Sequence, residues 1–195
     1  VTISQLLNMT SGIEFNESYF NPFGNAASVY YGRNLKKEIS KLKLEKNNSN
    51  SFNYSSGDSQ LLGLILESSL KGKKISQYLE EKLWKPLGME YDASWSLDKK
   101  NGVEKTFCCL NSVAIDYAKI GRLYLNNGNW NGKQLISKEW VEKTTKSENN
   151  KSGVWYYQNH WWISNKENRS FRAEGILGQY IYVNPKTETI IVRLG

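Results

Sequence analysis

Apolar and polar positions follow two different periods along the chain. Up to about residue 146, apolar side chains recur every three or four positions, which is typical of helices that bury one face. Beyond residue 153, short aromatic and β-branched stretches alternate with turn residues, which is typical of antiparallel strands. The pattern predicts one α+β domain in which an antiparallel sheet is flanked by helices. Residues 1 to about 150 form its mostly helical part and residues 151–195 its strands.

Capping and stop signals place the predicted helices. Thr2 and Gln5 have the spacing of a capping box, and Ser112 and Ser137 precede two further helices as N-caps. Polar residues 47–51 are predicted to form a linker. The predicted helical regions are 1–12, 27–44, 57–70, 75–89, 111–128 and 137–146.

The C-terminal part predicts three or four antiparallel strands. Asn184–Thr187 reads as a turn because proline and asparagine favour turn conformations. The predicted strand regions are 154–164, 169–175, 178–184 and 188–195.

Composition indicates a folded globular protein. The chain has 195 residues, of which 39% are hydrophobic, and it contains 7 Trp and 12 Tyr, so it has the material for a sizeable core. No apolar run reaches the length of a membrane-spanning helix. The chain begins at Val1 without a charged-then-apolar leader, which suggests a processed protein or a fragment.

The net charge of +7 raises the question of a nucleic-acid partner. The lysines, however, are scattered among Asn, Ser and Glu. The one dense basic run carries Leu35, Ile39 and Leu42 at helical spacing, so it predicts an amphipathic helix with a basic outer face. We therefore expect no nucleic-acid partner.

Cysteine and histidine are too scarce for a zinc site. Cys108 and Cys109 are neighbours, which cannot form an ordinary unstrained disulfide or set a disulfide framework, and His160 is the single histidine. We expect no metal unless carboxylates hold it, and no cofactor.

Two serine-based alternatives fit the sequence poorly. The Gly57-Asp58-Ser59 string resembles the signature of one esterase family, but no buried strand precedes it, and the alternative is that Asp58 and nearby hydroxyls cap a helix. A Ser-His-Asp triad would depend on His160, which lies in a predicted strand, and the sequence has no Gly-x-Ser-x-Gly elbow.

Ser-x-x-Lys pairs place a lysine beside a serine on one helical turn, where the amine can take the serine proton. Three such strings occur, and each is what a chain rich in Ser and Lys yields by chance. Lys186-Thr187 lacks the glycine of a Lys-Thr-Gly strand and lies in a predicted turn. The three strings are Ser40–Lys43, Ser68–Lys71 and Ser96–Lys99.

Several motifs together resemble the serine beta-lactamase and penicillin-binding-protein-like superfamily. The resemblance is to the class C-related branch, which includes 6-aminohexanoate-dimer hydrolases and esterases, and it covers essentially the whole chain. The segments that carry it are VTISQLLNMTSG, FNYSSGDSQLLGLILE, YLEEKLWKPLGM, AIDYAKIGRLYLNNGNWNGKQLIS and FRAEGILGQYIYVNP.

The resemblance implies a two-lobed fold with the site between the lobes. It also implies that the nucleophilic serine, within Ser-x-x-Lys, lies upstream of the segment where this chain starts. We therefore expect an incomplete, C-terminal portion that lacks the nucleophile, its lysine, the first sheet strands and the last helix.

The resemblance assigns two site residues to the 54–56 segment. Tyr54-Ser55-Ser56 matches the Tyr-x-Asn element of the family, so Tyr54 is the expected catalytic proton relay and Ser56 the expected substrate-binding residue. The alternative for Tyr54 is a half-buried loop tyrosine. Serine in place of asparagine loses the amide, which argues against typical beta-lactam recognition.

Ala173-Glu174-Gly175 matches the Lys-Thr-Gly strand of the family. Glu174 and Gly175 are the expected substrate-binding residues, and the Ile176 N–H is expected to supply half of the oxyanion hole. The lost lysine and threonine again argue against penicillin hydrolysis. Trp161 and Trp162 are candidates for a pocket wall or for core packing.

The resemblance implies a serine hydrolase of small-molecule amides or esters that acts through an acyl-enzyme intermediate and is inactive as this fragment. The alternative is a non-catalytic homologue that binds cell-wall peptides or a protein partner. The family also suggests the cell envelope or periplasm. The sequence leaves the compartment, the oligomeric state and the substrate open.

Overall fold

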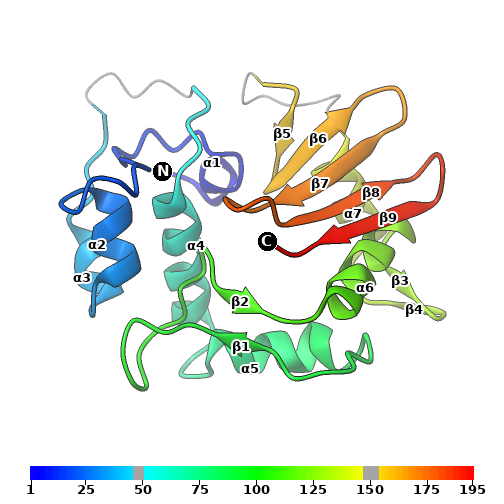
Figure 1. Cartoon of the computed structure of the whole chain (residues 1–195), viewed down its shortest axis with the longest axis horizontal. Coiled ribbons are helices and arrows are strands. Elements are labelled where there is room, and N and C mark those ends of the chain that lie inside the picture. The colour runs from blue at the N-terminus through cyan, green and yellow to red at the C-terminus, as the bar shows by residue number, and fades with distance from the viewer. Residues whose placement is uncertain (46–50, 147–153) are drawn as a thin grey trace. The chain divides into compact units, whose positions relative to one another are not determined.

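The computed structural model describes residues 1–45, 51–146 and 154–195, which divide into two compact units (Figure 1). The first unit comprises Val1–Tyr78 and Ser94–Asn111, and the second comprises Leu79–Ala93 and Ser112–Gly195. The predicted linker lies outside the described residues apart from Ser51. Helices and antiparallel sheets are both present, so the predicted α+β class is confirmed.

The first unit is mostly helical. Its helix α1 begins at Thr2 with the predicted capping box, in which the Thr2 hydroxyl accepts from the Gln5 N–H. The elements of this unit are α1 (Ile3–Leu7), α2 (Asn25–Tyr31), α3 (Leu35–Ser40), α4 (Ser56–Ser69), α5 (Ile75–Leu79) and the antiparallel pair β1 (Ser94–Trp95) and β2 (Leu110–Asn111).

The single helical region predicted over residues 27–44 is wrong. Two short helices, α2 and α3, occupy it, and Gly32 separates them in an extended conformation. Helix α3 has an N-cap of its own, because the Asn34 side chain accepts a hydrogen bond from the Lys37 N–H.

Helices α2, α3 and α4 pack side by side around a buried cluster of Val29, Leu35, Ile39 and Val103 (Figure 1). In α4, Gly57 lets the Phe15 ring pack against the helix beside this cluster, because a Cβ there would lie 2.6 Å from a ring carbon of Phe15.

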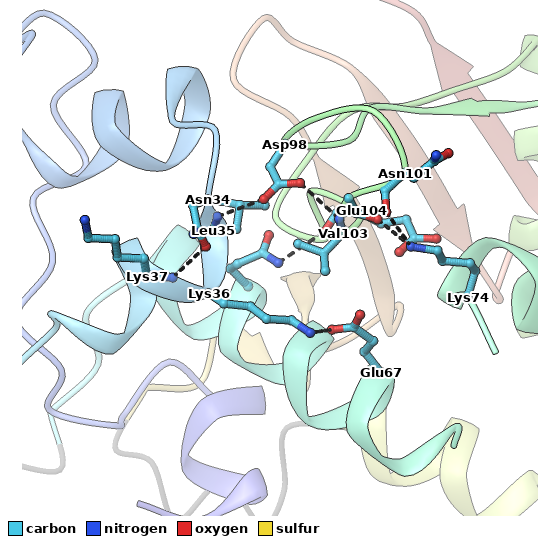
Figure 2. Close-up of polar contacts among 12 residues, drawn as sticks. Asn34, Leu35, Lys36, Lys37, Glu67, Lys74, Asp98, Asn101, Val103 and Glu104 are labelled. Atoms are coloured by element: carbon cyan, nitrogen blue, oxygen red, sulfur yellow. Dashed lines mark hydrogen bonds and ion pairs between the residues drawn. The ribbon is translucent and has the colours of Figure 1, made fainter. Parts of the chain in front are cut away.

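Hydrogen bonds connect the loop between β1 and β2 to the helical segments of this unit (Figure 2). The Asp98 carboxylate accepts from the Leu35 N–H at the start of α3 and from the Val103 N–H, both at 3.0 Å. Lys74 donates to the Gly102 carbonyl in the same loop at 2.6 Å. These contacts hold α3, the segment that precedes α5 and the β1–β2 loop together within the first unit.

The second unit begins where α5 ends. The helix predicted over residues 75–89 is present as α5 followed by a π-helical turn, η1 (Glu80–Trp84), in which the Lys85 N–H donates to the Glu80 carbonyl. The change of helix type lies next to Pro86, which has no N–H to donate.

Helix α6 (Ala114–Leu125) matches the predicted amphipathic helix, but its predicted cap is wrong. Val113 is the N-cap, and no side chain caps the helix. The Ser112 hydroxyl is buried and has no hydrogen-bond partner in the described part of the chain. The pair β3 (Asn129–Trp130) and β4 (Lys133–Gln134) follows, and then α7 (Lys138–Thr145), which the Ser137 hydroxyl caps as predicted.

The C-terminal residues form a five-stranded antiparallel meander in chain order, where three or four strands were predicted. The extra strand arises because residues 154–164 fold back on themselves at Asn159 and His160. Both have positive φ, the conformation of a tight two-residue hairpin turn. The strands are β5 (Tyr157–Gln158), β6 (Trp161–Asn165), β7 (Ser170–Glu174), β8 (Tyr180–Asn184) and β9 (Thr189–Arg193).

Helix α6 covers one face of this sheet (Figure 1). Trp161, Ile163, Phe171 and Val183 form the buried cluster of the unit. Gly121 lets the helix approach, since a Cβ at this position would lie 2.8 Å from a methyl group of Ile190. None of the helices in the described residues combines the length and the apolar character that a membrane crossing requires.

Candidate active site

The Tyr54-Ser55-Ser56 segment leads directly into α4 and is anchored to the segment after α1. The Asn53 N–H donates to the Met9 carbonyl at 2.8 Å, and the Ser55 N–H contacts the Met9 sulfur at 3.4 Å. Ser55 is the N-cap of α4, because its hydroxyl accepts from the Asp58 N–H. The backbone around Tyr54 is therefore fixed on both sides.

Ser56 is the first residue of α4 and is held by a carboxylate. Its N–H donates to Glu17 Oε1, and its hydroxyl donates to Glu17 Oε2 at 3.1 Å. The Tyr19 hydroxyl lies 3.5 Å from Ser56 Oγ. Burial raises the pKa of Glu17 above its usual range, although the hydrogen bonds from Ser56 oppose this shift.

Tyr54 and Glu17 line one open pocket of about 530 Å³. Tyr54 is 40% exposed, so its side chain is accessible to a small molecule. The pocket is polar and acidic, with a single phenylalanine in its wall. The lining residues are Glu14, Phe15, Asn16, Glu17, Asn25, Glu45, Asn53 and Tyr54.

Asp58 lies in the first turn of α4 but does not cap it with its side chain. Its carboxylate is fully buried and accepts from the Ser11 hydroxyl at 2.7 Å. Burial raises the pKa of Asp58 to about 6, and the nearby Glu17 charge adds to the rise while the Ser11 hydrogen bond opposes it. The predicted helix-start role thus belongs to the Ser55 hydroxyl, and the Ser59 carbonyl accepts from Thr106.

Glu17, Tyr19 and Ser11 were missed by sequence reasoning. Glu17 and Tyr19 lie in a segment with no helical or strand period, and Ser11 lies at the end of the first predicted helical region. Glu17 meets Ser56 from 39 positions away. A motif search along the chain carries no signal for such a pair.

Residues 173–176 lie in the second unit, at the end of β7 and in the turn that follows. The Gly175 N–H donates to the Gln179 carbonyl, and the Gly178 N–H donates to the Gly175 carbonyl at 3.0 Å. The Leu177 N–H is taken by the Gln179 side chain at 3.0 Å. The Ile176 N–H has no hydrogen-bond partner among the described residues, while its side chain is 76% exposed.

Gly175 is tightly surrounded. A Cβ there would lie 2.5 Å from Gln179 Oε1, the atom that holds the Leu177 N–H. Any larger residue would therefore disturb the turn that carries Ile176.

Glu174 is paired within its own sheet. Its carboxylate forms an ion pair with Arg172 Nε at 2.8 Å and accepts from the Tyr180 hydroxyl at 3.3 Å. The position of the threonine hydroxyl in the Lys-Thr-Gly pattern therefore presents a carboxylate whose charge Arg172 compensates.

The two tryptophans have different surroundings. Trp161 is buried against Phe171 and Tyr124, so it serves the core. Trp162, which is partly buried, stacks on Tyr156 with nearly parallel rings.

His160 and the cysteines lie outside both groups of site residues. Burial lowers the pKa of His160 to about 4, so it is neutral near pH 7, and its Nε2 has no hydrogen-bond partner among the described residues. Cys108 and Cys109 are joined to each other as a disulfide between sequence neighbours. Within the described ranges, no group of three or more His, Cys, Asp or Glu residues could hold a metal ion.

Comparisons with known proteins agree with this fold. The profile of the family described as Beta-lactamase matches residues 1–194. A 6-aminohexanoate-dimer hydrolase from Paenarthrobacter ureafaciens is 24% identical over 220 aligned positions, which cover 99% of this chain and 54% of that protein.

Solved structures of other proteins also match the fold of this chain. A structure from Bacillus anthracis, provisionally assigned as a 6-aminohexanoate-dimer hydrolase, superposes with a TM-score of 0.85 at 27% identity, over 98% of this chain and 54% of that one. A structure from Bacteroides dorei, provisionally assigned as a beta-lactamase, shares the fold with a TM-score of 0.72 at 16% identity, over 99% of this chain and 64% of that one.

The chain thus spans about half the length of the 6-aminohexanoate-dimer hydrolases that it matches. The family match extends over nearly all of its residues, as the motif order in the sequence predicts. The chain belongs to the beta-lactamase family.

Proposed function

We propose that this chain is part of a serine hydrolase that cleaves amide or ester bonds through an acyl-enzyme intermediate. The nucleophilic serine and its lysine belong to a Ser-x-x-Lys segment outside residues 1–195. Tyr54 is the catalytic residue that this chain contributes, and the Ile176 N–H is one donor of the oxyanion hole.

The observation that carries the proposal is the setting of Tyr54 in a family of hydrolases. The match to the Beta-lactamase family covers the segment, and Tyr54 lies exposed on a pocket at the start of an anchored helix. The contacts of Ser55 with Met9 and with the Asp58 N–H hold the backbone beside Tyr54 in place at this pocket, which supports the proposal.

The reaction follows from these groups. The serine oxygen attacks the carbonyl carbon while the lysine amine takes the serine proton. Tyr54 donates its hydroxyl proton to the leaving nitrogen or oxygen and regains one from the lysine. The amine or alcohol departs, water attacks the acyl-enzyme, and the acid is released.

The Ile176 N–H fits the role of an oxyanion donor. The other three amides of its turn, those of Gly175, Leu177 and Gly178, are used inside the turn. An N–H that needs no rearrangement to meet a developing charge stabilises the transition state at little cost. The serine N–H would be the second donor.

The substrate class that we propose is a linear amide, by analogy with the 6-aminohexanoate-dimer hydrolase that the chain resembles. The 173–175 string supports this choice over beta-lactams, because Ala173 carries no cation to grip a substrate carboxylate. Glu174 presents a paired carboxylate in place of the threonine hydroxyl. The non-catalytic alternative, a binder of cell-wall peptides or of a protein partner, shares the fold but needs no nucleophile.

The test is Tyr54→Phe in the full-length protein, meaning the product of the whole gene. We expect turnover of a p-nitrophenyl ester and of 6-aminohexanoate dimer to fall by about two to four orders of magnitude, since the change removes the relayed proton. Tyr91→Phe, which removes an exposed hydroxyl elsewhere, is the matched control.

Near-normal turnover by Tyr54→Phe would remove Tyr54 from the mechanism. A full-length protein without Ser-x-x-Lys on an apolar helix, and without hydrolysis of either substrate, would favour the non-catalytic binder.

A further inference from the structure

Ser56 gives both of its hydrogen-bond donors to one carboxylate. The backbone N–H meets Glu17 Oε1 and the hydroxyl meets Glu17 Oε2. Ser56 is 7% exposed. With both hydrogens engaged by Glu17, Ser56 has none left to donate to a substrate, although its oxygen can still accept.

Glu17 is held in place by its own neighbours. The Asn16 N–H donates to the Asn25 side chain at 3.0 Å, and the Asn16 carbonyl accepts from the Ala26 N–H at 3.1 Å. On the other side, the Ser18 N–H donates to the Asn16 side chain at 2.8 Å. The backbone that carries Glu17 is therefore tied to the start of α2, so Glu17 can fix its partner rather than follow it.

An ionised carboxylate only accepts hydrogen bonds, so it sets the direction of the chain of contacts. The Ser56 hydroxyl donates its hydrogen to Glu17, so the lone pairs of Ser56 Oγ face other donors. The Tyr19 hydroxyl lies 3.5 Å from Ser56 Oγ. The chain of contacts runs from Tyr19 through Ser56 to Glu17.

We propose that Glu17 is a positioning residue for Tyr54. Its carboxylate fixes Ser56, the first residue of α4, and thereby the backbone that presents the Tyr54 hydroxyl two positions earlier. Glu17 and Tyr54 line the same pocket, so a shift of the Glu17 contact reaches the site directly. This inference rests on the proposed function and assigns Ser56 to this contact instead of to the substrate.

The test compares two changes at Glu17 in the full-length protein. Glu17→Gln keeps the shape but has one acceptor oxygen for two Ser56 donors, and its NH₂ group opposes the second. We expect kcat for the p-nitrophenyl ester to fall by roughly 10- to 100-fold because the relay is misplaced, with KM unchanged. Glu17→Asp keeps both acceptor oxygens and should recover part of the lost kcat.

The matched control is Asp98→Asn. Asp98 also binds a backbone N–H at a helix start, that of Leu35, but at α3 and outside the pocket (Figure 2). It should lower the thermal unfolding midpoint without lowering kcat. If Asp98→Asn and Glu17→Gln lose kcat equally, Glu17 acts through stability alone and the proposal is wrong.

Tyr54→Phe is measured in parallel and separates the two proposals. Loss of turnover in Tyr54→Phe with wild-type kcat in Glu17→Gln overturns the role of Glu17 and leaves the proposed function intact. Wild-type turnover in Tyr54→Phe overturns both.

If Glu17→Gln does not fold, Ser56→Ala tests whether Glu17 positions Tyr54 through Ser56. It removes the hydroxyl contact to Glu17 and leaves the N–H contact in place. A lower kcat with unchanged KM supports positioning through Ser56. A higher KM with unchanged kcat makes Ser56 a substrate-binding residue and overturns the inference, as does wild-type behaviour in both constants.

Discussion

At the scale of single residues, the start of α4 concentrates two buried or half-buried carboxylates, Asp58 and Glu17. Each has a raised pKa, and the charge of Glu17 contributes to the rise at Asp58. Asp58 has one oxygen bound to the Ser11 hydroxyl and one buried oxygen without a hydrogen-bond partner in the described residues. An ionised Asp58 is therefore costly to the folded state.

The pH dependence of stability follows with a definite sign. The pKa of Asp58 rises from 3.8 to about 6 on folding. Between these values the folded protein keeps the proton and the unfolded chain releases it, so the free energy of unfolding falls as pH rises. Two pKa units correspond to about 3 kcal/mol.

We therefore expect Asp58→Asn to gain about 3 kcal/mol over the wild type between about pH 3.5 and about pH 7, because the variant no longer ionises at this site. Urea unfolding at several pH values measures the difference. Asp92→Asn, at an exposed carboxylate, is the control and should follow the wild type. A pH-independent difference between Asp58→Asn and the wild type would contradict the prediction.

At the scale of elements, α6 is joined to the segment of residues 88–91 by a buried carboxylate. Asp116 is fully buried and accepts from the N–H groups of Glu90 at 2.8 Å and Tyr91 at 3.0 Å. Lys119 donates to Asp116 at 3.2 Å and to the Gly88 carbonyl at 2.7 Å. Burial alone would raise the pKa of Asp116, but these hydrogen bonds and the Lys119 charge lower it.

Asp116→Asn should destabilise the second unit, because an amide can accept one of the two backbone N–H groups but turns its NH₂ toward the other. Leaving a buried backbone donor unpaired costs up to about 3 kcal/mol. Lys119 loses one contact but keeps Glu90 and the Gly88 carbonyl. Thermal and urea unfolding measure the change. The control is Glu142→Gln, which breaks an ion pair with Lys146 on the surface of α7 and should have a much smaller effect.

The elements differ in how well the sequence predicts them. Helix α6 was predicted nearly to its ends because its apolar face repeats over three turns. The break at Gly32 was missed because Leu35, Ile39 and Leu42 have a helical spacing directly after it, while a single glycine is a weak stop signal. The β5–β6 turn escaped prediction because Asn-His lacks the glycine that usually marks such turns.

At the scale of the whole molecule, the family and the fold class could be predicted because the ordered motifs are spread over the entire chain. The residues that contact the 54–58 segment from elsewhere in the chain could not be predicted. Glu17 binds Ser56, and Ser11 binds Asp58, across 39 and 47 positions, and such contacts depend on how the loops pack rather than on any local spacing. The roles of Tyr54, Ser56, Glu174, Gly175 and Ile176 stay predictions.

The last prediction concerns residues 1–195 as a separate polypeptide, which we expect to hydrolyse neither the ester nor the amide. A lysine that serves as a base needs desolvated surroundings, yet the lysines of all three Ser-x-x-Lys strings, Lys43, Lys71 and Lys99, are exposed. In the first string the Ser40 hydroxyl also donates to the Lys37 carbonyl. Circular dichroism verifies that the polypeptide is folded, and the full-length protein is the positive control. Hydrolysis by the folded polypeptide that is lost in Ser40→Ala, Ser68→Ala or Ser96→Ala would place the nucleophile within this chain and contradict the mechanism proposed for Tyr54.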